Sequence, residues 1–84
     1  MIRVLFFARI REQLGCASVD VPYSGQTETV AALQATLVAE HGDAWGEVLG
    51  RDNVISAVNQ EMVEAEHPLA DGDELAFFPP VTGG

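Results

Sequence analysis

The residues best suited to chemistry form the last segment of the sequence, Pro79-Pro80-Val81-Thr82-Gly83-Gly84. Prolines fix φ and favour the extended polyproline conformation, so six such residues reach roughly 18 Å at about 3.1 Å per residue. Glycines have no side chain and therefore fit a narrow channel in a partner protein. The reactive group of this tail is the α-carboxylate of Gly84, which is ionised at neutral pH. Chemistry there requires activation, for which an acyl adenylate made from ATP is suited.

A frayed end is the simpler interpretation of a segment rich in proline and glycine. A functional tail is favoured because the glycine pair is terminal, follows a rigid spacer and continues directly from a predicted core strand. The four cations of the chain are all arginines, and lysine is missing. Amines attack activated acyl groups, so a lysine-free chain cannot modify itself through a side chain. This composition favours a carrier over a polymeric tag, although compositional drift explains it equally well.

Length and charge restrict the possible functions of the chain. Its 84 residues allow one domain, expected at 1–78 with a flexible extended tail at 79–84, and leave little room for an independent catalytic site. The formal net charge of −9 excludes nucleic acids and anionic membranes as main partners. It suits a basic protein surface as partner, although solubility alone explains the acidity equally well. One cysteine, no signal peptide and no apolar run of about 20 residues predict a cytoplasmic protein.

Apolar periodicity predicts the elements that must position the tail. Strands are expected at 2–8, 17–21, 54–58, 62–65 and 74–78. The main helix is expected to begin after Thr27 or Thr29 and to end at Gly42, and short helices are expected at 9–14 and 43–49. The order strand, strand, helix, strand, short strand, strand indicates an α+β domain of the β-grasp, or ubiquitin-like, type. Its mixed sheet packs on one main helix, with short extra helical turns.

Alternation along the first and last strands predicts an exposed aromatic pair. Phe7 and Phe78 fall on the solvent side of neighbouring strands, and an exposed apolar patch usually marks an interface. Cys16 is expected to pack rather than react, and Trp45 is expected in the core. The two histidines are not spaced as helical metal ligands, so no metal site is expected. His41 is expected to interact with the end of the main helix.

Three segments closely resemble the small subunit of molybdopterin synthase: 1–8 (MIRVLFFA), 57–60 (AVNQ) and 67–84 (HPLADGDELAFFPPVTGG). The likeness spans the chain and is most specific over the last segment. It implies a ubiquitin-like fold and a sulfur carrier without a stably bound cofactor. An E1-like adenylating enzyme, a nucleotide-binding partner, uses ATP to activate Gly84, and a sulfur donor protein converts it to a thiocarboxylate.

The same resemblance implies the partner that receives the sulfur. The tail enters the large synthase subunit, Gly83 supports threading, and the sulfur passes to cyclic pyranopterin monophosphate to build the molybdopterin dithiolene. The synthase is a heterotetramer with two small subunits. Partner-binding positions implied by the resemblance or by the tail's place in the sequence are Phe7, Arg11, Met62, Phe78, Pro79, Pro80, Val81 and Thr82.

Other carriers and one other class remain as alternatives. β-Grasp carriers for thiamine, cysteine or transfer-RNA thiolation also end in Gly-Gly, so the tail alone does not separate them. The Phe-Phe-Pro-Pro-Val-Thr-Gly-Gly ending favours molybdopterin. A non-catalytic interaction module with an inert tail would instead tolerate loss of Gly83 and Gly84. An acyl carrier protein is rejected because Ser18 and Ser56 lie in predicted strands rather than at a phosphopantetheine site.

Overall fold

The computed structural model describes residues 1–50 and 54–79 of the chain. That part contains five strands and three helices. Their bounds are β1 (Ile2–Phe6), α1 (Ala8–Leu14), β2 (Ser18–Val21), α2 (Val30–His41), α3 (Asp43–Leu49), β3 (Ile55–Val58), β4 (Glu61–Val63) and β5 (Glu74–Phe78). The predicted order of elements is confirmed.

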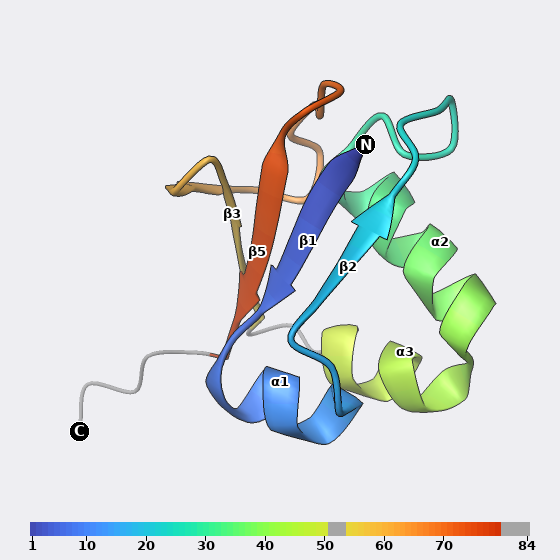
Figure 1. The fold of residues 1–84 in the computed structure, drawn as a ribbon, viewed down its shortest axis with the longest axis vertical. Coiled ribbons are helices and arrows are strands. Elements are labelled where there is room, and N and C mark those ends of the chain that lie inside the picture. The colour runs from blue at the N-terminus through green and yellow to red at the C-terminus, as the bar shows by residue number, and fades with distance from the viewer. Residues whose placement is uncertain (51–53, 80–84) are drawn as a thin grey trace.

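The strands form one mixed sheet in the order β2-β1-β5-β3-β4. The central strands β1 and β5 are parallel, and the other neighbouring pairs are antiparallel. Figure 1 shows α2 and α3 along one side of the sheet and α1 near one end of β1, opposite the N-terminus. The predicted β-grasp architecture, with one main helix against a mixed sheet, is therefore confirmed.

The core lies between the sheet and α2. Ile2, Val4 and Phe6 alternate along β1 and are fully or almost fully buried, as are Leu75 and Phe77 of β5. The helix contributes the predicted stripe at the spacing i, i+3, i+7, made of Val30, Leu33 and Leu37. Each large apolar side chain buried in this way contributes about 1.5–3 kcal/mol.

Helix α2 begins at a side-chain cap. The Thr29 hydroxyl accepts a hydrogen bond from the Ala32 N–H at 3.1 Å, which identifies Thr29 rather than Thr27 as the N-cap. Thr27 is instead buried, and its hydroxyl accepts from the Ser24 N–H and donates to the Pro22 carbonyl. The helix ends before Gly42, as the sequence predicts.

Two predicted strands, 2–8 and 62–65, each extend two residues too far at their C-terminal end. β1 stops at Phe6 because Ala8 adopts a φ of 51° and begins α1, so strand 2–8 is too long. β4 begins at Glu61 and ends at Val63 rather than spanning 62–65, because the turn needs only Asn59 and Gln60. Both strand ends depend on local backbone conformation, which the alternation of side chains does not predict.

Aromatic and sulfur side chains close the end of the core near α1 and α3. Trp45 is half-buried and meets Phe6 edge to face at 5.4 Å between ring centroids. The His41 ring stacks on the Trp45 ring, with 3.8 Å between their centroids. Cys16 packs against the core, and its thiol donates to the Ser18 carbonyl at 3.2 Å.

Among residues 1–50 and 54–79, none of the helices has the length and apolar character that a membrane span requires.

Candidate functional site

The tail to which the sequence assigns chemistry is only partly described. Pro79 follows β5 directly and is half-buried. Residues 80–84, which include Gly83 and Gly84 and the predicted contact residues Pro80, Val81 and Thr82, lie outside the described residues. Their roles stay predictions. The structure describes the surface next to Pro79, and that surface carries the other predicted contact residues.

The predicted aromatic pair is present beside Pro79. The rings of Phe7 and Phe78 stack with 4.8 Å between centroids and an interplanar angle of 6°. Phe7 is 37% exposed and Phe78 is half-buried. Stacked aromatic pairs gain about 0.5–1.5 kcal/mol beyond their buried area. The pair is therefore a stacked, partly exposed apolar surface at the end of β5.

Parallel pairing and one unusual backbone residue bring these rings together. Phe6 of β1 lies opposite Phe77 of β5, so the following residues, Phe7 and Phe78, reach the same end and side of the sheet. The Phe7 N–H donates to the Phe77 carbonyl at 3.2 Å. Ala8 then turns the chain into α1 with its left-handed φ of 51°. Such a φ costs a residue with a Cβ roughly 1–2 kcal/mol, which the surrounding packing must offset.

The aromatic pair belongs to a larger apolar surface on the sheet side opposite α2. Paired residues share a face of a sheet, and the registers place Leu5, Ala76, Ala57 and Met62 in one row. Ile55 lies opposite Phe78 in the next row. We call this surface the outer sheet face and define it by Leu5, Phe7, Ile55, Ala57, Met62, Ala76 and Phe78.

Exposure across the outer sheet face falls from its edge to its centre. Met62 is 77% exposed at its edge, whereas Ala57 and Ala76 at its centre are only 5% and 7% exposed. The larger neighbours screen these alanines, so Ala76 lies on the outer sheet face and is nevertheless buried. Leu5 alternates with the buried Val4 and Phe6 and therefore lies on this face. Ile55 and Ala57 were missed as surface residues because the register of β3 against β5 is not readable from the sequence.

A hydrogen-bond network fixes the hairpin that presents Met62. The Asn59 amide donates to the Asp73 carboxylate at 3.0 Å and accepts from the Glu74 N–H at 3.1 Å. The other Asp73 oxygen accepts from the Ala70 N–H at 2.9 Å. Asp73 is thereby engaged in holding a turn. Among the described residues, no group of three or more His, Cys, Asp or Glu side chains could hold a metal ion.

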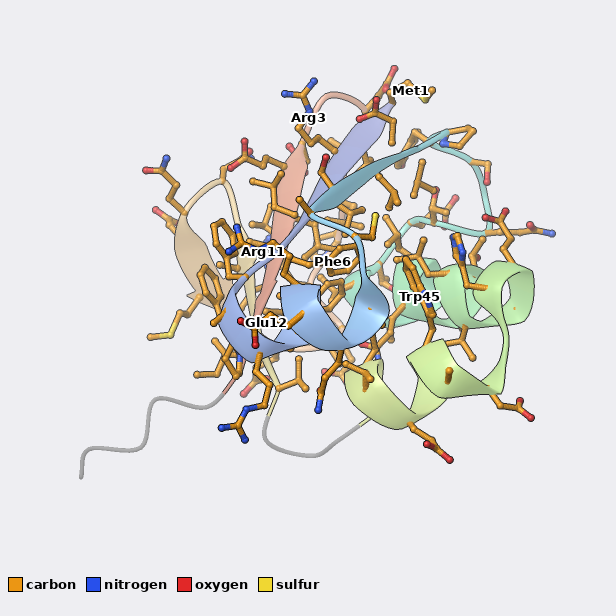
Figure 2. The ribbon with its side chains drawn as sticks, turned by 60° about the horizontal axis from the view of Figure 1, so that its bottom comes forward. Met1, Arg3, Phe6, Arg11, Glu12 and Trp45 are labelled. Atoms are coloured by element: carbon orange, nitrogen blue, oxygen red, sulfur yellow. The ribbon has the colours of Figure 1, made fainter. Side chains whose placement is uncertain are left out.

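Two arginines lie on α1, near the end of the sheet that carries the aromatic pair, whereas Arg3 lies at the opposite end of β1. Within the described part of the chain, Arg3 pairs with Asp20 at 3.6 Å, while Arg9 and Arg11 lie on α1 without a carboxylate at ion-pair distance. Figure 2 shows Arg11 on the side of α1 that faces away from Trp45. The predicted contact residue Arg11 is therefore exposed and available to a partner.

Together these features define a β-grasp domain with an exposed apolar sheet face at the root of a proline- and glycine-rich segment. The chain belongs to the ThiS family, whose model matches residues 4–84. It is 48% identical over 84 residues to the molybdopterin synthase sulfur carrier subunit of Escherichia coli strain K12, and the alignment covers 100% of both chains.

Solved structures show the same fold. SAMP1 from Haloferax volcanii superposes with a TM-score of 0.80 at 32% identity, covering 99% of this chain and 98% of that chain. A chain in the complex of subunits 1 and 2 of the molybdopterin-converting factor from Helicobacter pylori superposes with a TM-score of 0.68 at 27% identity. That match covers 99% of this chain and 97% of the other. The latter shows this fold in a two-subunit complex.

Proposed function

We propose that this protein is the sulfur carrier subunit of a molybdopterin synthase. The full-length similarity to a named carrier supports the class. The structural observation that carries the proposal is the position of the aromatic pair. Phe7 stacks on Phe78, the residue that directly precedes Pro79. A protein that binds the outer sheet face therefore also contacts the start of the tail. The same surface would thus bind the partner and direct Gly84 towards it.

The proposed chemistry takes place on the carboxylate of Gly84. An adenylating partner transfers AMP from ATP to this carboxylate, forming an acyl adenylate and releasing pyrophosphate. A sulfur donor protein then supplies sulfur at the oxidation level of sulfide, which bonds to the acyl carbon as AMP leaves, so that a thiocarboxylate forms. Two carriers in turn deliver sulfur to cyclic pyranopterin monophosphate, and water returns each tail to a carboxylate. We expect the carrier to act in the cytoplasm and to hold no stable cofactor itself, since ATP is bound and used by the activating partner.

The chain's own residues contribute binding and reach to this sequence. Exposed aromatic and apolar side chains are typical interface anchors, which suits Phe7, Met62 and Phe78. Arg11 adds a cation that can bind a partner carboxylate. Gly83 and Gly84 admit the chain end into a narrow channel, and Pro79 to Thr82 form the spacer that reaches it. The large synthase subunit is the proposed receiver, in a heterotetramer.

Intact-mass measurement tests the carrier chemistry. The protein is incubated with an active adenylating enzyme, ATP and a sulfur donor, and its C-terminal peptide is mapped because oxidation of either methionine mimics an oxygen-to-sulfur exchange. We expect a mass increase confined to Gly84 that requires ATP. A variant lacking Gly83 and Gly84 is the control. Absence of the shift, with an enzyme that modifies another carrier in parallel, would contradict the proposal.

Binding to the large subunit tests the docking surface and separates this carrier from those of other pathways. Phe78→Asp places a charge inside the aromatic stack and should weaken binding by about 2 kcal/mol or more, roughly thirtyfold. Tyr23→Asp is the control, since it makes the same change of charge at an aromatic residue, 42% exposed, on the loop after β2. Equal affinity of the Phe78→Asp variant and the unaltered protein would show that another surface docks.

A further inference from the structure

The outward side of α2 is apolar although no described segment covers it. Ala31, Ala35 and Ala39 are exposed there, and Val38 is half-exposed. A helix that is apolar around most of its circumference is normally buried. The outward side of α2 therefore has the composition of a surface that another molecule covers.

This side of α2 is the floor of a groove of about 500 Å³. We define the α2 groove by its lining residues Ala31, Gln34, Ala35, Val38, Ala39, Gly46 and Ala65. Gly46 lets α3 approach closely, since a Cβ there would lie 3.1 Å from the Val38 side chain. The opposite wall is fixed by the Ala31 N–H, which donates to the Ala65 carbonyl at 2.8 Å.

Four exposed glutamates neighbour the lining residues of the α2 groove along the chain, and we call them its rim. The charged neighbours of its lining residues along the chain are all carboxylates: Glu40 follows Ala39, Glu47 follows Gly46, and Glu64 and Glu66 flank Ala65. All four glutamates are exposed. A second copy of this chain would bring the same carboxylates together and be repelled. A segment that carries lysine or arginine beside small apolar side chains is complementary to the groove.

The α2 groove is continuous with the outer sheet face. A second hollow of about 500 Å³ shares Gln34 and Ala65 with the groove and extends to Ile55 and Met62 at the edge of the outer sheet face. β4, the edge strand between the two surfaces, has only three residues. A chain segment bound at Met62 can therefore pass around this edge and reach α2.

We propose that the α2 groove receives a basic segment of the same protein that docks on the outer sheet face. This inference rests on the proposed function, because the partner is the large subunit of the synthase. The outer sheet face supplies large apolar anchors, and the α2 groove adds a close apolar contact surrounded by carboxylates. The two contacts hold the carrier from both sides of the sheet and fix its orientation while the tail is delivered.

The test measures the dissociation constant of the complex with the large subunit by calorimetry. Ala35→Lys fills the groove floor with a long side chain of the wrong charge and should weaken binding about tenfold or more. Ala35→Glu introduces similar bulk with a favourable charge and should weaken it less. Ala44→Lys is the control, because Ala44 is exposed on α3 outside the groove. Circular dichroism confirms that each variant is folded.

The rim is tested by association rates at several salt concentrations. Glu47→Gln should slow association and reduce its dependence on salt, since the carboxylate steers a basic partner. Glu12→Gln is the control, because Glu12 is exposed on α1. Unchanged rates for both variants would overturn the acidic rim as a recognition element.

The outcomes separate this inference from the proposed function. If Phe78→Asp and Ala35→Lys weaken binding while Ala44→Lys does not, the two-sided contact is supported. If Phe78→Asp alone weakens it, the groove proposal is overturned and the proposed function stands. If the unaltered protein does not bind, the proposed partner is wrong, and both fail. Self-association in sedimentation, abolished by Ala35→Lys, would make a second copy the occupant and also overturn the proposal.

Discussion

The outer sheet face and the α2 groove lie on opposite sides of one core, and they are built from different side chains. The outer sheet face has aromatic and long apolar residues, of which Met62 is 77% exposed. The α2 groove has alanines and a glycine, with carboxylates around it. Large side chains act as anchors that enter a partner's pockets, whereas small ones allow a partner's backbone to come close. One small domain can thus present two kinds of contact.

The comparison depends on the core that the two surfaces share. Leu33 lies on the inner side of α2 and is completely buried against the sheet. Leu33→Ala should lower the free energy of unfolding by about 3–5 kcal/mol, because it removes buried surface and leaves a cavity. Urea denaturation measures this loss. Leu5→Ala, on the half-buried outer sheet face, should cost clearly less, and equal losses would contradict the division between core and surface.

The hairpin that presents Met62 can be loosened without touching α2. Asn59→Ala removes two side-chain hydrogen bonds at a left-handed position and should cost about 1–2 kcal/mol. Hydrogen exchange should quicken in β4 and remain slow in α2. Gln60→Ala is the control, since Gln60 is also left-handed, with a φ of 73°. Equal effects of the two substitutions would assign the loss to backbone strain rather than to the network.

The converse experiment loosens α2 and leaves the sheet intact. Thr29→Ala removes the N-cap hydroxyl that binds the Ala32 N–H and should cost about 1 kcal/mol. Exchange should quicken in the first turn of α2, beside the groove wall at Ala65. Thr29→Ser keeps the oxygen and should restore most of the stability. If the Thr29→Ser variant loses as much stability as the Thr29→Ala variant, the cap does not stabilise this helix.

The smallest expected effect concerns the aromatic stack itself. A double-mutant cycle with Phe7→Ala and Phe78→Ala should give a coupling free energy near the lower end of about 0.5–1.5 kcal/mol, because the pair is partly exposed. Thermal unfolding of the four proteins measures it. Additive losses would mean that the two rings contribute to the outer sheet face separately.

Much of this molecule was predictable because its signals are local. The stripe Val30, Leu33, Leu37 and the caps of α2 gave the helix, and alternation in β1 and β5 gave their inward residues. The pairing of Phe7 with Phe78 was also predictable, because the β-grasp order makes the first and last strands neighbours. The shortened β1 was not, since the left-handed Ala8 reflects packing of α1 rather than a preference of alanine.

The sequence by itself determined the elements, the inward faces of β1 and β5 and the proline- and glycine-rich end, because propensity, periodicity and composition act over a few residues. Only the tertiary structure decided that Ile55 and Met62 extend the outer sheet face and that Gly46 and Ala65 form walls beside α2. These residues are far apart along the chain. Strand register and helix packing bring them together, and both arise from the collapse of the whole core rather than from any short segment.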